Sequence, residues 1–158
     1  MRRIYLDDAG SSPVLNEVIE ALRDLPAANP SSLHAEGRAA RTALDRARDI
    51  AARALGADRT EITFTSSGTE AVNLALFGAA RRLSRRGAIV TWAADHQSVL
   101  AAVRQLESDG HTVEVANVDH NARADADSIG PGAVLVSIGL ANNEVGTIQP
   151  VAEVIARA

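Results

Sequence analysis

Short apolar runs alternate with helical patterns along most of this chain, and the alternation constrains its fold more than any other feature. Runs typical of strands lie at Ile62–Thr65, Ala88–Trp92, Thr112–Val115 and Ala133–Leu140. Helical patterns run from Glu70 to about Arg86, from about Gln97 to Asp109, and onward from Pro150. Strands that alternate with helices favour a parallel sheet that is covered on both faces. We therefore expect an α/β fold, mainly a parallel sheet with helices on both sides.

The first 56 residues have a different, mostly helical pattern. Ile4–Leu6 could form a short strand, and an apolar helical period follows at 14–25. Ser31 or Ser32 can cap a second helix that should end at Gly56. A chain of 158 residues fits one domain. We expect a single incomplete domain over residues 1–158, with an amino-terminal arm and helices at 1–56 and a cofactor-binding α/β part at 57–158. Residues 119–132 should form a loop with a short helical turn near Ala126.

The composition excludes several kinds of site. The net charge of -4 gives no basic field, so nucleic acid and anionic membrane are not expected as partners. No run is long and apolar enough for a membrane span, and a cytoplasmic location is expected. The chain contains no cysteine, which excludes disulfides, thiolate metal sites and a cysteine nucleophile. It also contains no lysine, because all 16 basic residues are arginine, so this chain alone cannot form a Schiff base with a lysine.

Three polar loops follow predicted strands. They contain Ser67–Thr69, His96 and Asn142–Glu144. Ligands of parallel sheets gather at the carboxyl ends of the strands. We therefore expect these loops to converge at one edge of the sheet.

The segment Ser66–Glu70 has the pattern of a tight turn from a strand into a helix. The first N–H groups of a helix and the positive end of its dipole bind anions such as phosphate. Gly68 allows close approach, and the hydroxyls of Ser66, Ser67 and Thr69 can add donors. An ordinary capped helix start would have the same pattern, since Ser and Thr are common N-caps.

His96 and the Asn142–Asn143 pair are the other candidate site residues. A lone histidine is most often a surface residue, but this one could stack on a planar ligand or move a proton. The asparagines could serve only the turn, or one could offer its amide to a ligand oxygen. The remaining histidines, His34, His111 and His120, show no metal-ligand spacing, so no metal site is expected.

Taken together in their order, these motifs resemble the amino-terminal part of the cysteine desulfurases. Those are pyridoxal 5′-phosphate (PLP) enzymes of the fold-type I aminotransferase superfamily, class V. The matching segments are Tyr5–Asp7, Asn29–His34, Phe64–Glu70, Asp95–Leu100 and Ala141–Gly146. The resemblance covers essentially the whole chain, with a slightly shortened stretch around 119–132.

The resemblance implies a role for four residues. Gly68 and Thr69 match the positions that hold the phosphate of PLP. His96 matches the histidine that stacks on the pyridine ring and assists proton transfer, which makes it the candidate catalytic residue. Asn143 matches the asparagine that contacts the phenolic oxygen of the cofactor. In the family the lysine that forms the aldimine, the cysteine that accepts sulfur and the small domain lie beyond the matched part.

The expected function is therefore that of the amino-terminal subunit of a split cysteine desulfurase. A second polypeptide would carry the carboxy-terminal half, including the aldimine lysine and the persulfide cysteine. The complex would convert L-cysteine to L-alanine, pass sulfur to an acceptor protein and contain two composite sites, and this chain alone would be inactive. The alternative is a non-catalytic, desulfurase-like binding or regulatory subunit. A gene fragment without an independent role and a different PLP reaction on an amino acid also remain open.

Overall fold

The computed structural model describes residues 4–83 and 86–158. The chain divides into two compact units, Met1–Phe64 and Thr65–Ala158. None of the helices in the described residues combines the length and the apolar character needed to cross a bilayer.

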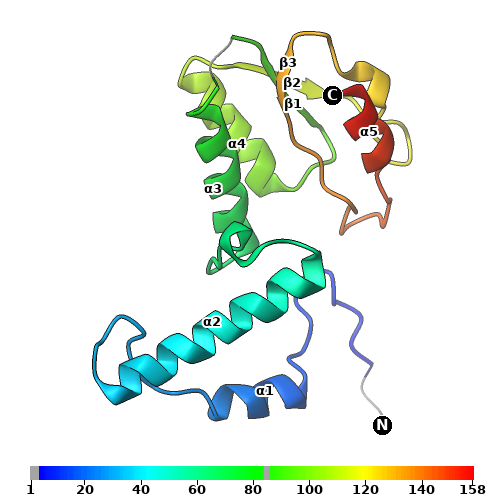
Figure 1. Ribbon diagram of the computed structural model, residues 1–158. Coiled ribbons are helices and arrows are strands. Elements are labelled where there is room, and N and C mark those ends of the chain that lie inside the picture. The colour runs from blue at the N-terminus through cyan, green and yellow to red at the C-terminus, as the bar shows by residue number, and fades with distance from the viewer. Residues whose placement is uncertain (1–3, 84–85) are drawn as a thin grey trace. The chain divides into compact units, whose positions relative to one another are not determined.

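The first unit is helical, with α1 at Asn16–Arg23, α2 at Ala35–Leu55 and the short 3₁₀-helix η1 at Arg59–Glu61 (Figure 1). Gly56 ends α2 in the left-handed conformation, at φ 66°, where the sequence predicts the end. The prediction that a serine caps α2 is wrong. The cap is His34, whose Nδ1 accepts from the N–H of Gly37 at 3.2 Å. Ser31 and Ser32 instead lie in a turn, where their N–H groups donate to Asn29.

The predicted strand at Ile4–Leu6 is also wrong. These residues pair with no strand in the described part of the chain, and the side chains of Ile4 and Leu6 are exposed. A run of three apolar residues forms a strand only where a neighbouring strand takes its hydrogen bonds.

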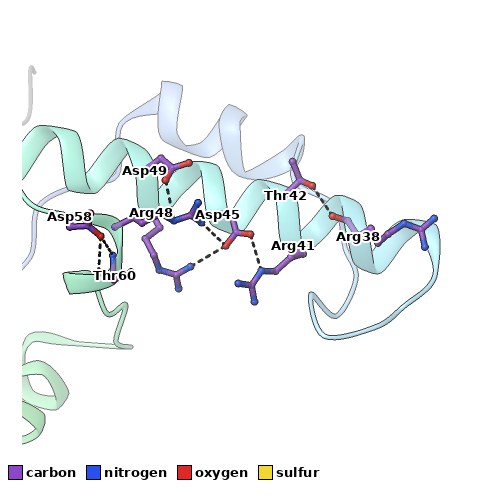
Figure 2. Close-up of polar contacts among 9 residues, drawn as sticks. Arg38, Arg41, Thr42, Asp45, Arg48, Asp49, Asp58 and Thr60 are labelled. Carbon is purple, nitrogen blue, oxygen red and sulfur yellow. Dashed lines mark hydrogen bonds and ion pairs between the residues drawn. The ribbon is translucent and has the colours of Figure 1, made fainter.

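The polar face of α2 carries several charge pairs. Asp45 accepts from the Nε of Arg41 at 2.9 Å and lies 3.3 Å from nitrogens of Arg48 and Arg59 (Figure 2). The hydrogen bond from Arg41, followed by the charges of the three arginines, lowers the pKa of the Asp45 carboxyl below its ordinary value of 3.8. Arg59 extends the network to Asp49 at 3.4 Å.

The second unit contains the parallel sheet that the sequence predicts. Its strands are β1 at Ala88–Trp92, β2 at Thr112–Ala116 and β3 at Ala133–Val136, in the spatial order β2-β1-β3. Both neighbours pair with β1 in parallel. The strand β3 is shorter than the predicted Ala133–Leu140, because beyond Ser137 the chain turns away and the N–H of Gly139 bonds to a side chain. The predicted strand at Ile62–Thr65 is wrong, since these residues pair with no described strand.

Helices cover both faces of this sheet. The helices α3 at Gly68–Ala80 and α4 at Gln97–Ser108 pack on one face, and α5 at Val151–Arg157 packs on the other (Figure 1). The side chains of β1 alternate between the two faces. Ile89 lies among residues of α3 and α4, whereas Val90 and Trp92 lie with Val154 of α5. The 3₁₀-helix η2 at Ala126–Ser128 provides the expected helical turn near Ala126.

The helix α3 ends at Ala80, earlier than the predicted end near Arg86. The N–H groups of Arg82 and Leu83 form turn hydrogen bonds to Ala79 and Ala80. Part of the predicted extension, residues 84–85, lies outside the described residues.

Candidate functional site

The amino-terminal end of α3 is a capped turn in which Ser67 bonds to the backbone of Glu70, and Glu70 bonds to Ser66, the residue before Ser67. Ser67 is extended, and its Oγ accepts from the N–H of Glu70 at 3.2 Å. The carboxylate of Glu70 accepts from the N–H of Ser66 at 2.7 Å and from its hydroxyl at 2.6 Å. The Ser66 hydroxyl, and then its N–H, hold the pKa of Glu70 below the ordinary value of 4.5. The exchange fixes the direction in which the helix begins.

This capping leaves a small set of donors at the start of the helix. The N–H groups of Gly68 and Thr69 donate to no described residue, and neither does the Thr69 hydroxyl. A Cβ built on Gly68 would meet no atom within 4 Å, so the approach to these groups is open. Of the three hydroxyls that the sequence offered to an anion, that of Ser66 donates to Glu70, whereas that of Ser67 only accepts the capping bond and keeps its hydrogen. The arrangement fits a phosphate group, held by two N–H groups and the dipole of a helix of 13 residues.

His96 lies at the carboxyl end of β1 and caps α4. Its Nδ1 accepts from the N–H of Ser98 at 3.1 Å and lies 2.8 Å from the Ser98 hydroxyl oxygen. Because Nδ1 accepts a backbone hydrogen bond, the proton of the neutral ring resides on Nε2. The ring is exposed, and Nε2 bonds to no described residue. His96 can therefore present a flat face and a free N–H to a ligand.

Asn142 and Asn143 have different surroundings. The side chain of Asn142 donates from Nδ2 to the carbonyl of Ala94 at 2.9 Å, and its Oδ1 accepts from the N–H groups of Glu144 and Val145, both at 2.9 Å. Asn143 is exposed, and its side chain bonds to no residue in the described ranges. Asn142 therefore builds the turn, whereas the amide of Asn143 is not used within the described residues.

One cavity of about 170 Å³ brings His96 and Asn143 together. It lies at the carboxyl ends of β1 and β3, where the parallel sheet predicts a ligand. Its lining residues are Val72, Ala94, Asp95, His96, Val99, Gly139, Ala141, Asn142, Asn143 and Gln149.

Gly68 and Thr69 are not among the lining residues of this cavity. The contact with α3 is made by Val72, four residues beyond Gly68 and hence about 6 Å along the helix axis. The structure thus brings His96 and Asn143 together at the cavity. Gly68 and Thr69 lie at the amino-terminal end of α3, the helix whose Val72 forms part of the cavity wall.

Sequence reasoning missed two residues of this site, Asp95 and Gln149. Asp95 accepts from the buried Thr91 hydroxyl at 2.6 Å and from the N–H of Gly139 at 2.8 Å. Asn142 joins the same two loops, and the buried Gln149 bonds to Ala122 at 2.7 Å and Ala124 at 2.8 Å. The position of Asp95, directly before His96, was the available signal.

The chemistry that this site allows follows from its donors. It offers an aromatic face, a free amide and an anion-binding helix end, which together suit a planar, phosphorylated ligand. In residues 4–83 and 86–158 there is no group of three or more histidine or acidic side chains that could hold a metal ion.

A sequence profile of the family named Aminotransferase class-V matches residues 4–158. The cysteine desulfurase IscS of Dictyoglomus turgidum is 41% identical over 160 residues, which cover 96% of this chain and 41% of that protein. The cysteine desulfurase IscS of Methanosarcina thermophila is 38% identical over 161 residues, covering 97% of this chain and 40% of its own. The chain thus spans about two fifths of the length of these relatives.

Solved structures show the same similarity. A NifS-like protein superposes with a TM-score of 0.91 at 33% identity, over 99% of this chain and 45% of its own. A structure described as SspA in complex with cysteine gives a TM-score of 0.85 at 35% identity, over 95% of this chain and 46% of its own. The α/β fold expected from the sequence is therefore confirmed.

Proposed function

Because the chain belongs to the aminotransferase class V family, we propose that it forms the amino-terminal, cofactor-binding part of a cysteine desulfurase. Class V aminotransferases and cysteine desulfurases use PLP. The relatives that match over nearly the whole chain are cysteine desulfurases, and the SspA structure is described as a complex with cysteine. The convergence of His96 and Asn143 on one cavity at the carboxyl edge of the sheet carries the proposal.

Each candidate residue has a defined part in this proposal. The N–H groups of Gly68 and Thr69, with the Thr69 hydroxyl, hold the phosphate of PLP. The imidazole of His96 lies against the pyridine ring and moves a proton through Nε2, since Nδ1 is occupied by Ser98. The amide of Asn143 donates to the phenolic oxygen. PLP, when bound, supplies an electron sink for bonds broken at the carbon atoms of the amino acid.

The remaining groups come from a second polypeptide. This chain contains neither the lysine that attaches PLP nor the cysteine that receives sulfur. A partner with the carboxy-terminal half would supply both, in a heteromer with two composite sites. In the overall reaction the C–S bond of L-cysteine breaks and an S–S bond forms on the partner's cysteine. The carbon gains one hydrogen to give L-alanine, and the persulfide keeps the other, so that the two thiols account for both hydrogens.

The first experiment isolates the protein from its native host and measures its mass, its partners and its absorbance. We expect a complex of this chain with a second polypeptide, which contains bound PLP and forms alanine from cysteine. A single native polypeptide of twice the length would contradict the split arrangement while leaving the family function intact. A complex without PLP would favour the binding or regulatory subunit instead.

Substitution of His96 tests its role in that complex. His96→Ala should lower alanine formation by about 100-fold or more, the usual contribution of a proton-transfer group. His111→Ala is the matched control, because His111 lies before the first residue of β2, at the opposite end of the sheet, and does not line the cavity. Alanine formation by the His111→Ala complex should stay within twofold of the wild-type rate. Equal activities of the two variants would remove His96 from the mechanism.

A further inference from the structure

Two side chains join the loop that carries His96 to the loop that carries Asn143. Asp95 Oδ1 accepts from the N–H of Gly139 at 2.8 Å, across 44 residues of sequence. Asn142 Nδ2 donates to the carbonyl of Ala94 at 2.9 Å, across 48 residues. We call this pair of hydrogen bonds the loop latch. It connects the segments that follow β1 and β3.

Each side chain of the loop latch is also held at its other end. The second carboxylate oxygen of Asp95 accepts from the hydroxyl of Thr91, which is fully buried in β1. The amide oxygen of Asn142 accepts from two backbone N–H groups of its own turn. Neither side chain is therefore free to rotate away. Each hydrogen bond of the loop latch thus holds the two loops at a fixed position relative to each other.

Gly139 permits the closer of the two contacts. A Cβ built on this residue would lie 3.1 Å from Asp95 Oδ1, closer than such atoms usually approach. The absence of a side chain at this position thus lets the carboxylate reach the backbone N–H.

The loop latch lies next to both candidate ring-binding groups. Asp95 precedes His96, Asn142 precedes Asn143, and all four residues line the same cavity. A planar ligand held between an imidazole and an amide needs a fixed spacing between them. We propose that Asp95 and Asn142 are positioning residues that set this spacing, an inference that rests on the proposed function for its ligand.

The first test measures the loops without any ligand. Amide hydrogen exchange of Gly139 and of position 142, whose N–H donates to Thr147, is compared in the wild-type chain, Asp95→Ala and Asn142→Ala. Exchange should become about tenfold faster in both variants, since one hydrogen bond across the loops is lost. The amides of Val90 and Val103 monitor the core and should not change. Asp125→Ala is the matched control, because Asp125 caps η2 with a similar bond to Asp127.

Asp95→Asn serves as the conservative variant. Its amide oxygen can still accept from Gly139, and its amide nitrogen can donate to the Thr91 hydroxyl. Exchange close to the wild-type rate in Asp95→Asn, with fast exchange in Asp95→Ala, would support positioning by this bond. Wild-type exchange in both alanine variants would overturn the proposal.

The second test adds a ligand. PLP and inorganic phosphate are titrated separately while the fluorescence of Trp92, the one tryptophan of the chain, is recorded. Asp95→Ala should weaken PLP binding about tenfold and leave phosphate binding within twofold, because only the ring depends on the loop spacing. Equal weakening of both ligands, or of neither, would contradict the inference. If the wild-type protein in its native complex binds no PLP, the proposed function is at fault, and the exchange rates still decide whether the loop latch holds the loops.

Discussion

The two units of this protein bury their apolar residues to very different extents. In the first unit, α1 contains no buried residue, and the buried positions of α2 are the small residues Gly37, Ala40 and Ala52. In the second unit Ile89, Val90 and Val103 are completely buried, and Trp92 is 1% exposed. Both units have amphipathic helices, so an apolar stripe alone does not specify a core. The candidate site lies in the unit whose core can hold its loops in place.

The largest expected effect tests that difference with the same substitution in both units. Ile89→Ala should lower the free energy of unfolding by about 2–5 kcal/mol, because a fully buried side chain leaves a cavity. Ile19→Ala, on the 39% exposed Ile19 of α1, should change it by less than about 0.5 kcal/mol. Chemical denaturation followed by circular dichroism measures both, and Trp92 fluorescence reports on the second unit. Similar losses in the two variants would show that the first unit has a comparable core.

Much of the second unit could be predicted from sequence, because its strands are both apolar and paired. The strand Ala88–Trp92 was predicted with its observed ends, since Gly87 and the polar residues after Ala94 bound a continuous apolar run. The pattern at Ile62–Thr65 is also typical of a strand, yet it forms none, because hydrogen-bonded pairing depends on segments distant in sequence. Local pattern therefore identifies candidate strands, and tertiary contacts select among them.

The candidate site shows the same limit. His96, Asn143, Gly68 and Thr69 could be identified from motif and loop position, although their roles in binding PLP remain predictions. The bond that Asp95 makes could not be predicted, because its partner Gly139 is 44 residues away and has no side chain to mark it. A hydrogen bond to a backbone N–H leaves no pattern in the sequence of the partner.

A glycine in the first unit tests whether this weakly buried unit also has a position that does not tolerate a side chain. The expected effect is smaller than that of Ile89→Ala. A Cβ on Gly37 would collide with the carbonyl oxygen of Ser32, so Gly37→Ala should cost about 1–3 kcal/mol despite the open character of α2. Gly78→Ala is the control, because Gly78 lies in α3 with no atom within 4 Å of the added carbon. That variant should gain about 0.5–1 kcal/mol from its higher helix propensity. Tolerance of alanine at position 37 would mean that the turn before α2 is not fixed.

The smallest expected effect concerns two carboxylates with lowered pKa values. The Ser66 hydroxyl and N–H hold the pKa of Glu70 below 4.5, whereas the pKa of Asp45 is lowered below 3.8 by a hydrogen bond from Arg41 and by three arginine charges. A lowered pKa stabilises the fold at pH values above the ordinary value, and the contribution disappears as the pH falls through the value in the folded state. The two groups should therefore lose their contributions in acid, Glu70 from about pH 4.5 downward and Asp45 from about pH 3.8 downward.

Salt separates these two carboxylates, since it screens the exposed charge pairs of Asp45 but has little effect on bonds from neutral donors to Glu70. Denaturation of Glu70→Gln and Asp45→Asn is measured at neutral and acidic pH, at low and high salt. At neutral pH, the destabilisation in Asp45→Asn should fade in high salt, and that in Glu70→Gln should persist. Both differences from wild type should shrink in acid, because the wild-type carboxylates become protonated. If high salt also abolished the effect of Glu70→Gln, the capping bonds at Ser66 would not be what stabilises the start of α3. The second unit would then depend on surface charge in the same way as the first.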